Sequence, residues 1–178
     1  MRPAMKSKIS LEAIKALREK TSASLSDVRN ALEASGGDEA KALEYLRQRG
    51  AEIAEQRRGR ETGQGRVESY VHHNGRLGAL VEVNCETDFV ARTPEFLQFC
   101  RDVAMQVAAM SPRYVRPEDV PSDHRISPDE IKGVCLLEQP FVKDPTATVH
   151  DLLKALIAKS GENVVIRRFV KFTLGEPS

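Results

Sequence analysis

Residues 66–84 read RVESYVHHNGRLGALVEVN, a stretch in which apolar and polar side chains alternate on both sides of Asn74-Gly75. Alternation with a period of two is typical of a β-strand that buries one face. Asn-Gly is the dipeptide that most readily supplies the positive φ angles of a tight turn. The stretch therefore predicts an antiparallel hairpin with strands over residues 66–73 and 76–84.

The residues after the hairpin predict two helices. Thr93 and Pro94 form a good helix start, because threonine can cap a helix and proline suits the first helical position. An apolar stripe at helical spacing follows them. Thr148 and Asp151 form a capping box ahead of a second helix with an apolar face, which should end at Gly161.

A third strand is predicted over residues 163–174, which alternate like the hairpin. Residues 113–132, with their prolines and many charges, should form no long helix or strand. The fold class is therefore α+β, with helices flanking a small three-stranded antiparallel sheet. On the third strand, one apolar face is expected to be shared by Val164, Ile166, Val170 and Phe172.

Residues 10–50 predict three short helices, because their apolar side chains fall at helical spacing in three bursts. Ser24 and Asp27 form a pair like a capping box, Asp38 can cap the third helix, and Gly50 is expected to end it. The charged segment that follows lacks an apolar stripe and is interpreted as a linker. The predicted domains are a three-helix module over 1–52, a basic linker over 53–65 and an α+β core over 66–178.

Composition limits the possible functions. With 27 basic and 26 acidic residues the net charge is +1, which disfavours bulk binding of nucleic acid. Cys85, Cys100 and Cys135 are widely spaced without a CxxC pair, so we expect free thiols in a reducing compartment. No apolar region follows the basic residues at positions 1–8, and no apolar run is long enough to span a membrane. We expect a cytoplasmic protein, bacterial rather than organellar, with no membrane association.

No residue pattern predicts an active site, a cofactor or a bound metal. Adjacent His72 and His73 should point to opposite faces of a strand, so both cannot serve one site with Cys85. The acidic residues near the end of the hairpin are separated and have no partner histidine. The glycines of residues 59–65 do not form a phosphate-binding motif. The sequence therefore predicts a protein that is not an enzyme.

The corner Thr87-Asp88-Phe89-Val90 sets an acid beside a large aromatic residue at the point where a strand stops. A corner between a strand and a helix should be rigid and at least partly exposed, which suggests a projecting tip that binds a partner. The alternative is that Phe89 lies under the following helix and Asp88 caps a nearby amide. Residue types alone favour this alternative, because most phenylalanines are core residues.

Residues 82–92, which read EVNCETDFVAR, resemble the signature of elongation factor Ts, the nucleotide exchange factor for elongation factor Tu. Residues 17–32, 136–144 and 161–169 are similar to other parts of the same family. The resemblance covers nearly the whole chain except residues 122–134, where the family generally carries a longer helical segment. The chain is thus interpreted as a compact member with a shortened middle segment.

The resemblance implies a function and two sets of contact residues. In the family, a Thr-Asp-Phe-Val tip presses into the nucleotide domain of elongation factor Tu near its Mg²⁺ site and promotes GDP release. That tip corresponds here to Thr87, Asp88, Phe89 and Val90. The N-terminal module resembles the family's ubiquitin-associated-like domain, whose second contact corresponds to Leu25, Ser26, Asp27, Val28 and Arg29.

Two further features follow from the resemblance. Ser22, Ser26 and Arg29 depart from the family pattern, and the smaller apolar surface should weaken the second contact. Compact members suggest a homodimer joined through the core sheets, with the third strand supplying an apolar surface.

Two other functions remain open from the sequence. The first is an adaptor whose helical module binds a peptide or a ubiquitin-like partner and whose core dimerises. The second is a thiol-dependent hydrolase that uses Cys85, which would require rapid labelling of that thiol near neutral pH. Acceleration of GDP release from elongation factor Tu would distinguish an exchange factor from both.

Overall fold

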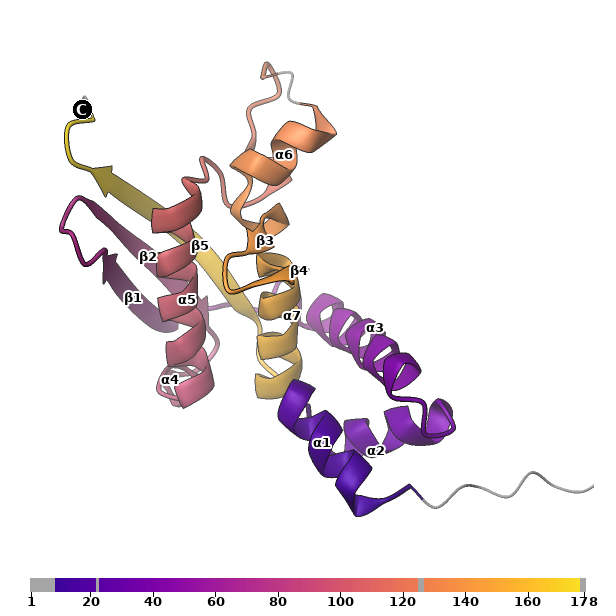
Figure 1. Ribbon diagram of the computed structural model, residues 1–178. Coiled ribbons are helices and arrows are strands. Elements are labelled where there is room, and N and C mark those ends of the chain that lie inside the picture. The colour runs from indigo at the N-terminus through magenta and orange to yellow at the C-terminus, as the bar shows by residue number, and fades with distance from the viewer. Residues whose placement is uncertain (1–8, 22, 125–126, 177–178) are drawn as a thin grey trace, which may run out of the picture.

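The computed structural model describes residues 9–21, 23–124 and 127–176 (Figure 1). Residues 1–8, Ser22, residues 125–126 of the shortened middle segment and residues 177–178 lie outside this part of the chain. Helices and an antiparallel three-stranded sheet confirm the predicted α+β class. The helices are α1 (Leu11–Thr21), α2 (Leu25–Ala34), α3 (Glu39–Arg57), α4 (Asp88–Ala91), α5 (Pro94–Met110), α6 (Pro128–Val134) and α7 (Val149–Ser160). The strands are β1 (Gln64–Val71), β2 (Leu77–Cys85), β3 (Pro140–Phe141), β4 (Asp144–Thr148) and β5 (Val164–Thr173).

The main core lies between the three-stranded sheet and two helices. The sheet has the order β1-β2-β5, and both neighbouring pairs are antiparallel. Helices α5 and α7 pack on one face of it (Figure 1). Val81 and Val83 of β2 and Ile166 of β5 are buried there with Phe96 of α5 and Leu156 of α7. The burial of this apolar surface is the main force that holds the sheet and the helices together.

The predicted hairpin is confirmed, but its turn is longer than expected. Strands β1 and β2 pair from Gln64↔Cys85 to Val71↔Gly78. The N–H of His72 donates to the carbonyl of Leu77 at 2.9 Å, so residues 73–76 form the turn. Gly75 supplies a positive φ of 67°. The predicted two-residue turn is wrong. The N–H of Gly75 donates to the carbonyl of His72, so the turn includes His73 and Arg76 as well as Asn74 and Gly75.

The third strand is present, but its apolar residues do not share one face. The register of β5 against β2 shifts once, which leaves Arg167 as an extra, unpaired residue. Because side chains alternate along a strand, one extra residue moves those that follow to the other face. Val164 and Ile166 are therefore buried, whereas Val170 and Phe172 are exposed. The expectation of a single face is wrong because a bulge carries no period-two signal.

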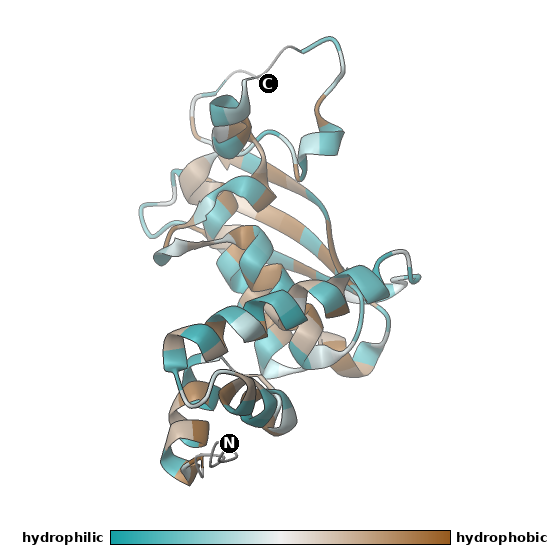
Figure 2. Cartoon of the chain, turned by 90° about the vertical axis from the view of Figure 1, so that its right-hand side faces the viewer, coloured by the Kyte–Doolittle hydropathy of each residue, from teal (hydrophilic) through white to brown (hydrophobic). Residues whose placement is uncertain are grey.

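Helices α1, α2 and α3 enclose a second, smaller core. Its buried residues are Leu17, Val28, Ala31, Leu32 and Ala42. The predicted caps are confirmed: Ser24 accepts from the N–H of Asp27, and Asp38 accepts from the N–H of Lys41. Figure 2 shows these helices at the lower end of the molecule, with hydrophilic and hydrophobic residues mixed along each of them.

Helix α3 is longer than predicted. It runs through Gly50 to Arg57, so the expected helix end at Gly50 is wrong. Gly50 is buried, and a Cβ placed there would lie 3.7 Å from Cβ of Ala158 in α7, so the residue has a packing role. Ile53 and Ala54 in the extension pack against the main core. The first residues interpreted as linker are therefore helical and packed.

Both predicted helix starts in the core are confirmed. The N–H of Phe96 donates to the hydroxyl of Thr93 at 3.3 Å. The N–H of Asp151 donates to the hydroxyl of Thr148, and a carboxylate oxygen of Asp151 accepts from the N–H of Thr148. No sequence pattern predicts the small β3–β4 sheet, because it is short and carries Pro140, a residue that argues against a strand.

Candidate protein-binding site

Residues 85–92 form a short projection between the sheet and α5, referred to below as the tip. Strand β2 ends at Cys85, and Thr87 caps the short helix α4 by accepting from the N–H of Val90 at 3.4 Å. The hydroxyl of Thr93 donates to the carbonyl of Val90 at 2.9 Å, which joins α4 to the start of α5. In Figure 1, α4 lies at the lower end of α5. Hydrogen bonds thus fix the backbone of the tip on both sides.

Phe89 is the most exposed large apolar side chain of the described residues. Its exposed fraction is 78%, whereas Ala91 in the same helix is 8% exposed and Val90 packs partly against the core. The alternative that buries Phe89 under the following helix is therefore wrong: α4 turns Ala91 inward and Phe89 outward. The tip offers an aromatic ring to solvent on an ordered backbone.

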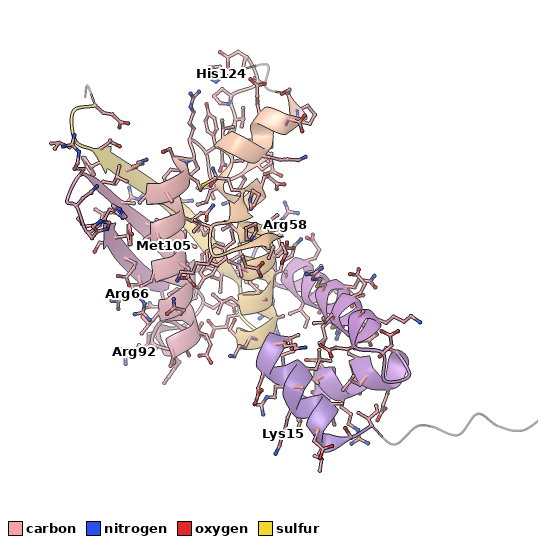
Figure 3. The ribbon with its side chains drawn as sticks, viewed as in Figure 1. Lys15, Arg58, Arg66, Arg92, Met105 and His124 are labelled. Carbon is pink, nitrogen blue, oxygen red and sulfur yellow. The ribbon has the colours of Figure 1, made fainter. Side chains whose placement is uncertain are left out.

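Asp88 lies beside this ring and pairs with Arg92. The carboxylate oxygen and guanidinium nitrogen are 2.8 Å apart, with side chains 46% and 77% exposed. Exposed ion pairs contribute little net free energy, so Asp88 can exchange Arg92 for another group at small cost. Figure 3 labels Arg92 near the lower end of α5, below Met105 of the same helix. The tip therefore presents a carboxylate next to an aromatic ring.

Sequence reasoning missed the residues that contact the tip from elsewhere in the chain, among which Glu162 makes two hydrogen bonds. Glu162 follows the C-cap glycine of α7, and its carboxylate accepts hydrogen bonds from both the backbone N–H and the hydroxyl of Thr87. No local pattern could have found this contact, because the two residues are 75 positions apart in the sequence.

Cys85 is an unreactive thiol at the base of the tip. It is fully buried, and its Sγ donates to the carbonyl of Thr87 at 3.1 Å. Burial raises the pKa of Cys85 to about 11, and the negative charge of Glu162 adds to this shift. The thiol is therefore protonated at neutral pH and is a poor nucleophile. Cys85, Cys100 and Cys135 are all buried, and none of them forms a disulfide. This agrees with the free thiols that the sequence predicts.

The two adjacent histidines do not support a site with Cys85. They lie beyond the end of β1, and their ring centroids are 4.2 Å apart, so the expectation that His72 and His73 face opposite sides is wrong. That expectation assumed that both were in a strand. His72 lies at the edge of the turn and His73 lies within it, and the length of β2 separates both from Cys85 by roughly 25 Å. The geometry excludes a nucleophile and base pair.

The second set of predicted contact residues lies on α2. Leu25 is 57% exposed, Ser26 and Arg29 are exposed, and Asp27 is half-buried. Arg29 pairs with Glu33 one turn along the helix. Val28 is fully buried in the small core, so its side chain is not at the surface. Only part of the predicted set therefore forms an accessible patch.

Within residues 9–21, 23–124 and 127–176, no three His, Cys, Asp or Glu side chains are grouped to hold a metal ion. In the same ranges, no helix combines the length and the apolar character that crossing a membrane requires.

Comparisons with known proteins agree on one family. The family model described as elongation factor TS matches residues 7–131. A protein named elongation factor Ts from Carboxydothermus hydrogenoformans is 48% identical over 195 residues, which cover 94% of this chain and 90% of the relative. The protein of that name from Rubrobacter xylanophilus is 50% identical, over 92% of this chain and 98% of the relative. The one from Thermotoga petrophila is 45% identical, over 94% and 97%.

The alignments also show that this chain is shorter than these relatives. The alignment with the C. hydrogenoformans protein spans 195 residues, whereas the chain has 178. The relative therefore has residues that have no counterpart here. This agrees with a chain in which one segment of the family pattern is shortened.

Proposed function

Because the chain belongs to the elongation factor Ts family, we propose that it promotes the release of GDP from elongation factor Tu. Family membership makes the chain a translation elongation factor. The observation that carries the proposal is Phe89, an aromatic side chain 78% exposed on a tip whose backbone is fixed by hydrogen bonds. Aromatic residues of this kind supply much of the free energy of protein–protein binding.

The proposed mechanism is displacement of the partner's Mg²⁺ ligands. Phe89 acts as an apolar wedge that enters a pocket of the nucleotide domain, and Asp88 offers a competing charge beside it. Mg²⁺ requires nearly ideal octahedral geometry, so a small displacement of its ligands removes much of its binding free energy. GDP without its cation then dissociates faster. Thr87 and Val90 hold the wedge in place, since Thr87 caps α4 and Val90 packs on the core.

The proposed activity involves no covalent chemistry. If the chain weakens GDP binding to its partner, GDP must weaken the binding of the chain by the same factor, and a new nucleotide then releases it. The protein is therefore proposed to be a binding protein rather than an enzyme, and it needs no cofactor of its own.

A second contact is proposed at the N-terminal module. Leu25, Ser26 and Arg29 form its accessible part, and Asp27 lies at its edge. Val28 supports the patch from below, because it is buried against the small core. In Figure 1, α4 lies at the lower left below the sheet and α2 at the lower right beside α1, so the proposal requires a partner large enough to span both.

Replacing Asp88 by alanine should lower the exchange rate about fivefold, because a partly exposed charge at the rim of an interface contributes less than a buried aromatic anchor. The measurement is stopped-flow release of fluorescent GDP from elongation factor Tu. Arg92→Ala is the matched control, since it removes the other half of the same ion pair and leaves Asp88 free. Equal losses in both variants would show that the pair matters only for the structure of the tip.

A homodimer is proposed through the outer face of the sheet. This face carries exposed apolar side chains from three strands, namely Val67, Val71, Leu80, Val170 and Phe172. Apolar residues gathered on a solvent-facing sheet surface mark an interaction site. The bulge at Arg167 contributes to this surface, because it turns Val170 and Phe172 outward.

Phe172→Glu should shift the protein from dimer to monomer, because it places a charge in an apolar interface. We expect the dimer dissociation constant to rise by at least about 30-fold. Sedimentation equilibrium measures the change. Leu11→Glu is the control, because Leu11 is also mostly exposed but lies on α1. A dimer of unchanged affinity in Phe172→Glu would reject this interface.

The test of the proposed function is GDP release from purified elongation factor Tu with and without the unaltered chain. Acceleration supports the exchange factor, and its absence supports the adaptor function, in which the helical module binds a peptide or ubiquitin-like partner. We propose that this activity belongs to the cytoplasm of a bacterium, and the bacterial origin of the relatives compared above supports the bacterial part of this proposal. No direct contact with nucleic acid is proposed.

A further inference from the structure

A single carboxylate joins the tip to the loop between α7 and β5. Oε2 of Glu162 accepts from the backbone N–H of Thr87 at 3.0 Å, and Oε1 accepts from the Thr87 hydroxyl at 2.6 Å. Hydrogen bonds to an ionised acceptor are roughly twice as strong as those between neutral groups. Both bonds join Thr87 and Glu162, so together they fix the orientation of Thr87 as well as its distance from Glu162.

A second carboxylate, on the tip itself, accepts a hydrogen bond from the loop between α7 and β5. Oε1 of Glu86, the residue before Thr87, accepts from the backbone N–H of Asn163 at 2.6 Å. The side-chain amide of Asn163 donates to the carbonyl of Arg60 at 2.8 Å. Nη1 of Arg60 in turn lies 3.5 Å from Oε2 of Glu86. Residues 86–87 and 162–163 therefore hold each other through reciprocal hydrogen bonds.

The tip needs this support because it stabilises itself poorly. Helix α4 has 4 residues, and helices so short are unstable alone. Phe89 makes little packing contact, since it is mostly exposed. The hydroxyl of Thr87 donates to Glu162 and accepts from the N–H of Val90, so the carboxylate also sets the direction of the cap that starts α4.

We propose that Glu162 is a positioning residue for the exchange reaction: it holds Thr87 so that Asp88 and Phe89 meet the partner in the orientation that displaces its Mg²⁺. This inference rests on the proposed function. Gly161, with a φ of 71°, ends α7 and turns Glu162 toward the tip, so the orientation of Phe89 depends on α7 and β5 as well as on its own hairpin. Misplacing an acting group by about 1 Å can lower a rate up to a hundredfold.

The first test is Glu162→Gln, which keeps the size of the side chain but removes its charge and replaces one of its two acceptor oxygens by an NH2 group. We expect the maximal rate of GDP release to fall about tenfold, with the concentration of half-saturation changed less than threefold, because Phe89 still reaches the partner. Glu162→Asp keeps the charge and should recover part of the maximal rate. A maximal rate within twofold of the unaltered chain in Glu162→Gln would overturn the proposal.

The second test measures how firmly the tip is held, through the accessibility of Cys85, whose Sγ donates to the carbonyl of Thr87. In a chain carrying Cys100→Ala and Cys135→Ala, Glu162→Gln should raise the labelling rate of Cys85 about tenfold when rates are compared per thiolate, because loosening the tip opens a route to the thiol. The pKa of Cys85 is taken from the pH dependence of labelling in each variant, since loss of the Glu162 charge alone raises the thiolate fraction. The control is Asp102→Asn, which breaks the ion pair between Asp102, on α5 away from the tip, and Lys143.

The two tests separate this proposal from the proposed function. If the unaltered chain fails to accelerate GDP release, the exchange function is rejected, and faster labelling in Glu162→Gln would still show that Glu162 holds the tip. Equal labelling in Glu162→Gln and Asp102→Asn would reject that role even if exchange is observed. Circular dichroism of each variant establishes that a slow rate does not come from unfolding.

Discussion

Phe89→Ala should lower the rate at which the chain releases GDP from elongation factor Tu by about 30- to 100-fold. Aromatic residues that become desolvated at the centre of an interface typically contribute 2 kcal/mol or more, which corresponds to this change. Because Phe89 is 78% exposed in the free chain, its removal should hardly change the free energy of unfolding. The measurement pairs stopped-flow GDP release with urea unfolding of the same variant.

Two variants control this prediction. Met110→Ala truncates another exposed apolar side chain, 45% exposed at the opposite end of α5, and should leave the exchange rate unchanged. Phe89→Leu keeps an apolar group of reduced size and should fall between the unaltered chain and Phe89→Ala. A Phe89→Ala variant as active as Met110→Ala would remove the wedge from the mechanism.

Gly65→Ala should destabilise the protein by about 3 kcal/mol, the largest stability change predicted for the chain. Gly65 has a φ of +149°, and a Cβ placed there would lie 2.2 Å from the carbonyl oxygen of Val83 and 2.7 Å from Cα of Asn84. Both are backbone atoms of β2, which cannot move aside as a side chain can. Backbone strain and overpacking each cost about 1–3 kcal/mol.

Urea unfolding of Gly65→Ala measures this loss, with Gly63→Ala as the matched control. A Cβ at Gly63 has no heavy atom within 4 Å, so this variant should match the unaltered chain to within about 1 kcal/mol. Equal stability of the two variants would mean that β1 does not approach β2 as closely as described. Since β2 leads into the tip and Gly65 pairs with Asn84 near the end of β2, Gly65→Ala should also weaken exchange.

Local signals predicted the parts of the fold that depend on neighbouring residues. Caps such as Thr93 and Thr148 could be predicted because the donor, the acceptor and the first helical turn lie within a few residues of each other. The hairpin around Gly75 could be predicted because alternation on both sides and the turn dipeptide point to the same structure.

Features that depend on distant residues could not be predicted in the same way. The bulge at Arg167 comes from the pairing of β5 with β2, and the continuation of α3 beyond Gly50 comes from its packing on α7. The contact of Glu162 with Thr87 joins two loops far apart in sequence. The division into a module, a linker and a core stays a prediction.

The candidate site shows the same limit. Composition and spacing placed an acid beside an aromatic residue at a strand end, but residue types favoured a buried Phe89. Phe89 is exposed because of the orientation of α4, which places Ala91 against the core and Phe89 in solvent. On α2, by contrast, helical spacing could have identified Val28 as a core position, since it falls on the same stripe as Leu32.

The most direct test of the central claim is GDP release as a function of Mg²⁺ concentration, for the unaltered chain and for Phe89→Ala. If Phe89 acts by displacing the partner's Mg²⁺, the two proteins should differ at least about 30-fold at millimolar Mg²⁺. They should become nearly equal when a chelator has removed the ion. The same ratio of rates with and without Mg²⁺ would contradict the account.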